Sequence, residues 1–190
     1  MVTLLVGLAL FVVVHSVRIV APNWRAAQVA RWGVLRWRLM YSVLSVAGFV
    51  AMAWGFERAR AASAVLWVPT LQMRHVTVGL MALACMLWVS AFMPASHVRA
   101  KLQHPGAAGV SVWAAAHLLA NGRLVDALLF GSLLVWSVLS FAAGRGSGAA
   151  TSTPGLRWQH DALAVALGAL GWLIFARFLH APLIGVAPLG

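Results

Sequence analysis

Acidic residues are almost missing from this chain of 190 residues, which contains only Glu57, Asp126 and Asp161. Hydrolysis by paired carboxylates needs two acids close to one substrate, and these three are expected at separate helix ends. The sequence also lacks the G-x-S-x-G turn of serine hydrolases and the glycine-rich loops that bind phosphate groups. We therefore do not expect a hydrolase or a nucleotide-dependent enzyme.

Cysteine is equally scarce, since Cys85 is the only one and it lies in the middle of an apolar run. A single thiol excludes an internal disulfide and a metal cluster held by several thiolates. We expect Cys85 to face lipid or another helix as a small buried side chain.

Apolar residues, by contrast, dominate: they make up 63% of the chain, charged residues 9%, and the mean hydropathy is +0.91. Such a composition excludes a soluble domain and predicts one all-α transmembrane bundle of five to six helices, with the lipid bilayer as its surroundings. The net charge of +11 comes mostly from arginines in the short loops between apolar runs. That distribution is typical of membrane topology, so we expect no nucleic-acid partner.

The apolar runs predict the positions of the helices within a single domain, 1–190. Full-length spans are expected at 2–21, 39–56, 75–93, 124–143 and 162–181. Segment 24–38 mixes tryptophan with arginine, which is typical of an interfacial loop or helix. A flexible linker is predicted at 144–157, and a shorter central helix at about 106–121, between Pro105 and Gly122.

The charges around the first span predict its orientation. No basic residue precedes the span, whereas a cleaved signal peptide would carry its positive charge there. We expect a retained helix with its N-terminus outside and the following loop in the cytoplasm. The basic residues that support this orientation are Arg18, Arg25, Arg31, Arg36 and Arg38.

Three polar details of the helices carry structural expectations. Ser42, Ser45 and Gly48 offer a small-residue packing edge in the second span. Arg123 and Asp126 are one turn apart and are expected to pair. His160, beside Asp161, is expected to be a solvated loop histidine.

The central helix carries the strongest functional signal. Trp113, His117 and Asn121 fall at i, i+4 and i+8 and so form one stripe. The small side chains expected to leave space around the histidine are Ala114, Ala115, Ala116 and Ala120. One interpretation is that His117 only bonds a neighbouring helix and that the alanines serve helix packing. The other is a functional site, because an ionisable side chain within a membrane is a functional candidate.

A second intramembrane histidine, His15, lies near the inner end of the first span, one turn before Arg18. It either bonds a backbone carbonyl or takes part in a metal, haem or proton-relay site. His104 and His117 are 13 residues apart, roughly 20 Å along a helix, so they cannot bind one metal ion. If the first and central helices face each other, His15 and His117 could be the two axial ligands of one haem, with Arg18 near a propionate.

Several motifs together resemble the NnrU family of bacterial membrane proteins, most specifically within residues 1–142. They are His15-Ser16 followed by Arg18, Trp67-x-Pro69 followed by Arg74-His75, His104-Pro105, and Trp113-x-x-x-His117-x-x-Ala120-Asn121-Gly122. The resemblance implies a multi-pass protein of the bacterial inner membrane that is linked to denitrification and nitric oxide metabolism.

The same family includes the plant and algal 15-cis-zeta-carotene isomerase, a haem b (heme b) enzyme. The resemblance implies that His15 and His117 ligate the haem iron and that His75 and His104 are also required. In the isomerase a cysteine precedes the second histidine by three residues, whereas here that position is Ala114. The candidate cofactor-binding residues are His15, Arg18, His75, His104, Trp113, Ala114, His117 and Asn121.

A more distant likeness concerns the turn at His104 and Pro105. It is similar to the isoprenylcysteine and phospholipid methyltransferases, which use S-adenosylmethionine, but their Glu-Glu and Arg pattern is missing after Leu124. Three functions stay open: a haem-dependent isomerase acting on a lipid-soluble molecule, a haem protein of nitrogen-oxide or electron-transfer metabolism, and a non-catalytic membrane factor. A methyltransferase-like protein is a further alternative, and the sequence does not establish the oligomeric state.

Overall fold

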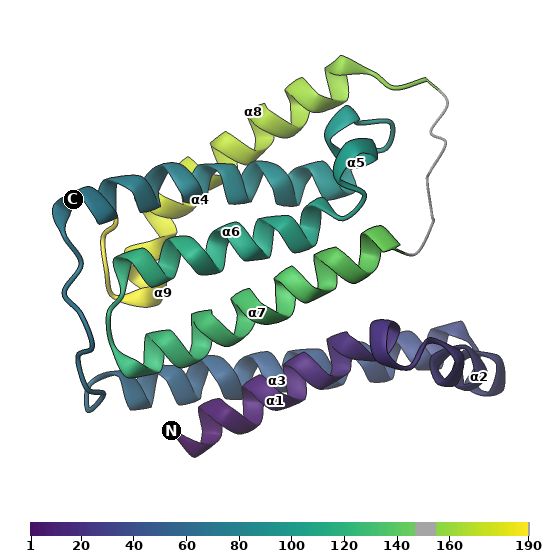
Figure 1. The fold of residues 1–190 in the computed structure, drawn as a ribbon, viewed down its shortest axis with the longest axis horizontal. Helices are drawn as coiled ribbons and strands as arrows, with labels where there is room; N and C mark the ends of the chain where they lie inside the picture. The colour runs from purple at the N-terminus through teal and green to yellow at the C-terminus, as the bar shows by residue number, and fades with distance from the viewer. Residues whose placement is uncertain (147–154, 190) are drawn as a thin grey trace. The chain divides into compact units, whose positions relative to one another are not determined.

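The protein is helical, as the composition predicts (Figure 1). The computed structural model describes residues 1–146 and 155–189. Five of the helical segments in these ranges are long and apolar enough to cross a membrane, and α6 is a shorter apolar helix, so the expectation of five to six membrane helices is confirmed. The helices are α1 (Val2–Val20), α2 (Pro22–Trp32), α3 (Val34–Arg60), α4 (Leu71–Phe92), α5 (His97–Leu102), α6 (Pro105–Ala120), α7 (Leu124–Gly146), α8 (Trp158–Ile174) and α9 (His180–Ile184), with a π-helical turn (Phe175–Leu179) between the last two.

Some helix ends differ from those predicted. Gly33 has a φ of +82°, which a side chain disfavours, and it separates α2 from α3, so α3 begins at Val34. Thr70 caps α4 by accepting from the amide of Met73 at 3.2 Å, so α4 begins earlier than predicted. The predicted linker 144–157 is wrong at its start, because α7 continues to Gly146. Residues 147–154 of that linker lie outside the described part.

The chain forms two compact units. The first unit comprises Met1–Trp67 and Arg123–Leu129, and the second comprises Val68–Gly122 and Phe130–Gly190. Each unit is described by itself below, and the assignment of the whole chain to one domain stays a prediction.

Backbones approach closely in the first unit, where α1 and α3 pack antiparallel. A Cβ atom on Gly7 would lie 2.8 Å from the carbonyl oxygen of Gly48, and one on Gly55 would lie 2.7 Å from the Cα of Leu4. One on Gly48 would lie 3.0 Å from the amide nitrogen of Phe11. Glycine therefore permits the contact at all three places, as small residues do at helix interfaces within lipid. The predicted packing edge is right for Gly48, whereas Ser42 is exposed and Ser45 bonds the carbonyl of Tyr41 in its own helix.

Arg123 completes the first unit by covering the C-terminal end of α3. Its guanidinium donates to the carbonyl oxygens of Arg60 and Ser63, both at 3.1 Å, while its amide donates to Asp126 Oδ2 at 2.9 Å. The expected pairing of the two residues is therefore made by the backbone amide of Arg123, and its side chain binds the helix end. A basic group suits this place, because the last carbonyls of a helix have no partner within it.

In the second unit α4 packs against α6 and α8. A Cβ atom on Gly109 of α6 would lie 2.6 Å from the Trp88 ring, and one on Gly168 of α8 would lie 2.5 Å from Met86 Cα. Thr77 Oγ1 donates across the α4–α6 interface to the carbonyl of Ala116 at 3.0 Å. This bond places the N-terminal end of α4 beside the C-terminal end of α6, where the candidate residue His117 lies.

Candidate functional site

His15 lies half-buried on α1, within the first unit. Its Nδ1 atom is 2.7 Å from the carbonyl oxygen of Phe11, one turn earlier. Because a carbonyl can only accept, Nδ1 carries the proton and Nε2 is the acceptor nitrogen of the neutral ring. The ring stacks on Phe11 with centroids 4.0 Å apart and meets the edge of Tyr41 from α3 at 5.2 Å. The structure therefore supports the interpretation that His15 bonds a backbone carbonyl, and its role as a ligand stays a prediction.

Arg18 is exposed, one helical turn beyond His15 on α1. Its expected contact with a haem propionate stays a prediction.

His117 lies half-buried near the C-terminal end of α6, in the second unit. Its Nδ1 donates to the carbonyl oxygen of Trp113 at 2.9 Å, and the side-chain Nδ2 of Asn121 donates to the backbone carbonyl of His117 at 2.9 Å. The imidazole packs against the rings of Trp113 and Phe130, with centroids 4.8 and 4.7 Å apart. The predicted stripe is therefore present, and each of its members contacts the next.

The sequence predicted that the alanines of α6 leave space around His117, but not all of them do. Ala114 and Ala116 are fully buried, whereas Ala120 is partly exposed. The carbonyl of Ala116 accepts the Thr77 bond, so this part of α6 serves helix packing as well.

His104 stands at the start of α6, directly after Gln103, whose φ of +63° is rare for a residue with a side chain. Its ring lies against α7 where Gly144 has no side chain, since a Cβ atom there would overlap the imidazole. Further along α6, the hydroxyl groups of Ser111 and Ser137 are hydrogen-bonded at 2.8 Å, and the ring of His117 packs on that of Phe130. The three contact positions on α7 are therefore seven residues apart: Gly144, Ser137 and Phe130. His104 and His117 therefore contact α7 at different levels, as expected from their spacing.

His75 is exposed in the second turn of α4. The second unit thus holds His75, His104, Trp113, Ala114, His117 and Asn121, and the first unit holds His15 and Arg18. A haem ligated by both His15 and His117 therefore stays a prediction. No group of three or more His, Cys, Asp or Glu side chains that could hold a metal ion occurs among the described residues.

A polar cluster around Asp161 was not predicted from the sequence. This buried carboxylate accepts from Ser96 Oγ at 2.6 Å and from His97 Nδ1 at 2.6 Å, whereas the sequence predicted only its position at a helix end. The neighbouring His160 is also bonded, through Nδ1 to the carbonyl of Pro94. A usable signal was the Ser96-His97 pair at the start of a short helix, together with the scarcity of acids.

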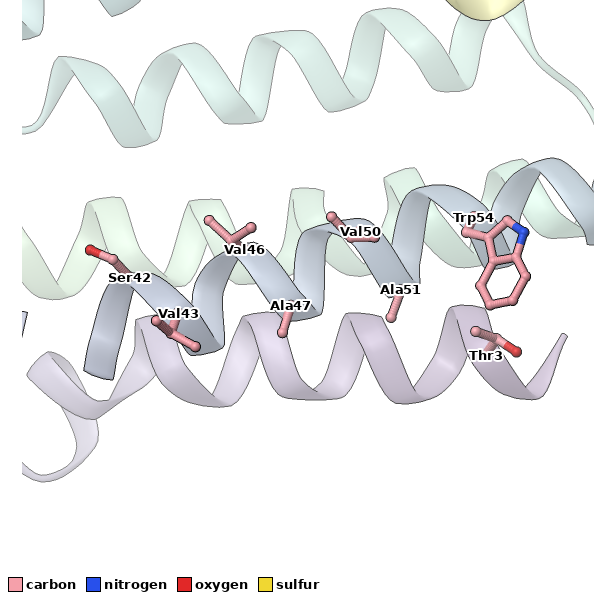
Figure 2. A pocket seen from close by; sticks show the side chains of 8 residues that line it. All are labelled: Thr3, Ser42, Val43, Val46, Ala47, Val50, Ala51 and Trp54. Carbon is pink, nitrogen blue, oxygen red and sulfur yellow. The ribbon is translucent and has the colours of Figure 1, made fainter. Parts of the chain in front are cut away.

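A shallow apolar groove lies along α3 in the first unit. Figure 2 shows its lining, in which small aliphatic side chains of α3 are joined by Trp54 and by Thr3 of α1. None of the candidate histidines lines this groove, and we assign it no ligand.

Comparison with known proteins gave one family. The family model described as NnrU protein matches residues 3–188, which include the last helix and so extend beyond the 1–142 of the motif resemblance. Neither the comparison with curated proteins nor that with solved structures gave a match.

Proposed function

Since the chain belongs to the NnrU family, we propose that it is a haem b-binding protein of the bacterial inner membrane, with His15 and His117 as axial ligands. In this proposal the protein serves nitrogen-oxide metabolism in denitrification, or acts on a lipid-soluble molecule by redox chemistry or isomerisation. Its N-terminus lies outside, in accord with the arginines that follow α1.

The observation that carries the proposal is the common geometry of the two histidines. Each donates Nδ1–H to the carbonyl four residues earlier, at 2.7 Å in His15 and 2.9 Å in His117. Ligating histidines are commonly oriented in this way, by a hydrogen bond from the ring nitrogen that does not bind the metal. Both rings therefore present Nε2 as the ligating atom, without a change of tautomer.

The surroundings of both rings also fit a large apolar cofactor. Phe11 and Tyr41 flank His15, and Trp113 and Phe130 flank His117. A haem needs only two protein ligands, since its ring supplies four nitrogen donors, and so it requires no three-residue metal cluster. When bound, haem b supplies an iron centre that exchanges single electrons.

The remaining candidates have supporting roles in this proposal. Arg18 supplies a positive charge for a propionate near the end of α1. His104, whose ring lies against Gly144, is at one end of the α4–α6 pair, and His75 is at the other. Their proposed role is to orient or hydrate the site. Ala114 takes the place of the isomerase cysteine and supplies no thiolate, so ligation relies on the two imidazoles.

The absorption spectrum of the full-length protein, purified in detergent after expression with ample haem, tests the proposal. We expect a Soret band and a low-spin spectrum, because two imidazoles give the iron a strong ligand field. His15→Ala and His117→Ala should each change the spin state or remove the haem. The matched controls are His160→Ala and His180→Ala, whose rings bond the carbonyls of Pro94 and Val186 and should leave the spectrum intact. A colourless protein would refute the cofactor, and a spectrum that neither ligand variant changes would refute the ligands.

A further inference from the structure

The start of α8 is fastened to the turn between α4 and α5, in the second unit. The amide of Arg157 donates to the carbonyl of Ala95 at 2.9 Å. Asp161 Oδ1 accepts from Ser96 Oγ at 2.6 Å and from the amide of Val98 at 3.2 Å. These bonds join residues more than sixty positions apart, so the local surface is held in a defined shape.

Within this surface His97 has a fixed orientation. Its Nδ1 lies 2.6 Å from Asp161 Oδ2, and its ring stacks on Trp158 with centroids 4.1 Å apart and an interplanar angle of 18°. Because the carboxylate accepts from Nδ1, a neutral ring presents Nε2 as a hydrogen-bond acceptor. The side chain is 30% exposed, and among the described residues no group bonds Nε2. A hydroxyl from outside the protein could therefore donate to it.

The charge around His97 is positive. Arg99, Lys101 and Arg157 are all exposed. Asp161 is the only acid in the sequence of the second unit, and its two carboxylate oxygens accept hydrogen bonds from Ser96 and His97. Trp158 is 74% exposed and is the first residue of the apolar segment Trp158–Ile184. An exposed tryptophan at the beginning of a span is typical of the level of lipid headgroups.

We propose that this surface, made of His97, Arg99, Lys101, Arg157 and Trp158, is a headgroup site for a hydroxyl-bearing anionic phospholipid of the phosphatidylglycerol class. The phosphate interacts with the three cations, a headgroup hydroxyl donates to His97 Nε2, and the indole of Trp158 packs at the ester level. A lipid is favoured over free phosphate, because the exposed indole offers apolar contact that only a lipid uses. The site is separate from the haem proposal and does not depend on it.

Thermal unfolding of the full-length protein in neutral detergent, with added lipid, tests the site. We expect phosphatidylglycerol to raise Tm more than phosphatidylcholine, because ligands that bind the folded state stabilise it. Phosphatidylmethanol has the same phosphodiester charge without a headgroup hydroxyl, so it should raise Tm less than phosphatidylglycerol. Inorganic phosphate should have little effect; an equal shift from phosphate alone would show a free-anion site and overturn the lipid assignment.

His97→Asn isolates the role of Nε2, because the asparagine amide can still donate to Asp161, while its shorter side chain places no acceptor at the position of Nε2. We expect an affinity for phosphatidylglycerol about three- to tenfold weaker, as for the loss of one hydrogen bond, and no change for phosphatidylmethanol. The matched control is His180→Asn, since the His180 ring bonds the carbonyl of Val186 in the C-terminal segment, and it should change neither affinity. Counting bound lipids by native mass spectrometry gives a second measurement for any variant of altered Tm. Equal binding of both lipids, or wild-type selectivity in His97→Asn, would overturn the proposal.

Discussion

Within each unit, the long helices contact one another in a different way. In the first, α1 and α3 approach so closely that glycine is needed at positions 7, 48 and 55. In the second, polar side chains also join separate elements, through Thr77 to Ala116, Ser111 to Ser137 and Asp161 to the turn before α5. The first unit should therefore be sensitive to added volume, and the second to the loss of a hydrogen-bonding group.

The two candidate histidines have the same local geometry, although the helix contacts of their units differ. His15 and His117 lie in different units, yet each bonds the carbonyl four residues earlier and packs on the aromatic residue at that position. The common geometry follows from helical spacing, in which residues four apart are neighbours. Local geometry alone therefore orients both rings, whatever holds each unit together.

The largest effect should come from Asp161→Ala in the second unit. The substitution leaves Ser96 Oγ, two amides and the His97 ring without their acceptor, and each unsatisfied buried donor is costly. We expect the free energy of unfolding, measured by SDS titration with circular dichroism, to fall by about 2 to 4 kcal/mol. Glu57→Ala removes an exposed acid of the first unit and should change it by less than about 0.5 kcal/mol. Equal losses in the two variants would contradict a special role of the Asp161 cluster.

Added volume tests the first unit. Gly55→Val places a branched side chain against the backbone of Leu4, so α1 and α3 must separate. We expect the free energy of unfolding to fall by about 1 to 3 kcal/mol, as for overpacked cores. Gly79→Val is the matched control in α4, since no atom lies within 4 Å of its Cβ position, and it should cause no loss. If Gly55→Val is as stable as the wild type, the close approach is not what holds the pair.

The smallest effect concerns single hydroxyl groups. Thr77→Val keeps the side-chain shape but removes the bond to Ala116, which crosses between α4 and α6. We expect a loss of about 0.6 kcal/mol, the average for a hydrogen bond between membrane helices. Ser45→Ala removes a bond to Tyr41 within α3 alone and should cost less in the same SDS titration. The reverse order would show that bonds within a helix matter as much as those between helices.

Local patterns in the sequence predicted local structure well. The central helix was expected at 106–121 and is observed at Pro105–Ala120, and the stripe of Trp113, His117 and Asn121 follows from the helical repeat. The predicted start of the second span was wrong, because segment 24–38 was treated as one interfacial piece and Gly33 was not recognised as its end. Charge and tryptophan content describe the environment of a segment and not the dihedral angles of one glycine.

Contacts between distant segments could not be predicted in the same way. Asp161 lies next to His160 in the sequence, yet its partners are Ser96 and His97, more than sixty positions away. Arg123 and Asp126 have the spacing of a helical ion pair, yet the guanidinium binds the end of α3. For the candidate site, each histidine's own hydrogen bond follows from helical geometry, whereas the pairing of His15 with His117 depends on packing that no local pattern contains.

The position of Arg123 also has a consequence for biosynthesis. The first unit includes residues 123–129, so the ribosome must make more than fifty residues of the second unit before the first has all its parts. At about 5 to 20 residues per second, the interval between Trp67 and Leu129 lasts roughly 3 to 12 s. During that time the carbonyls at the end of α3 lack the guanidinium that later binds them. The first two spans therefore enter the membrane as an unfinished pair, whose completion waits for a segment made only after α4, α5 and α6.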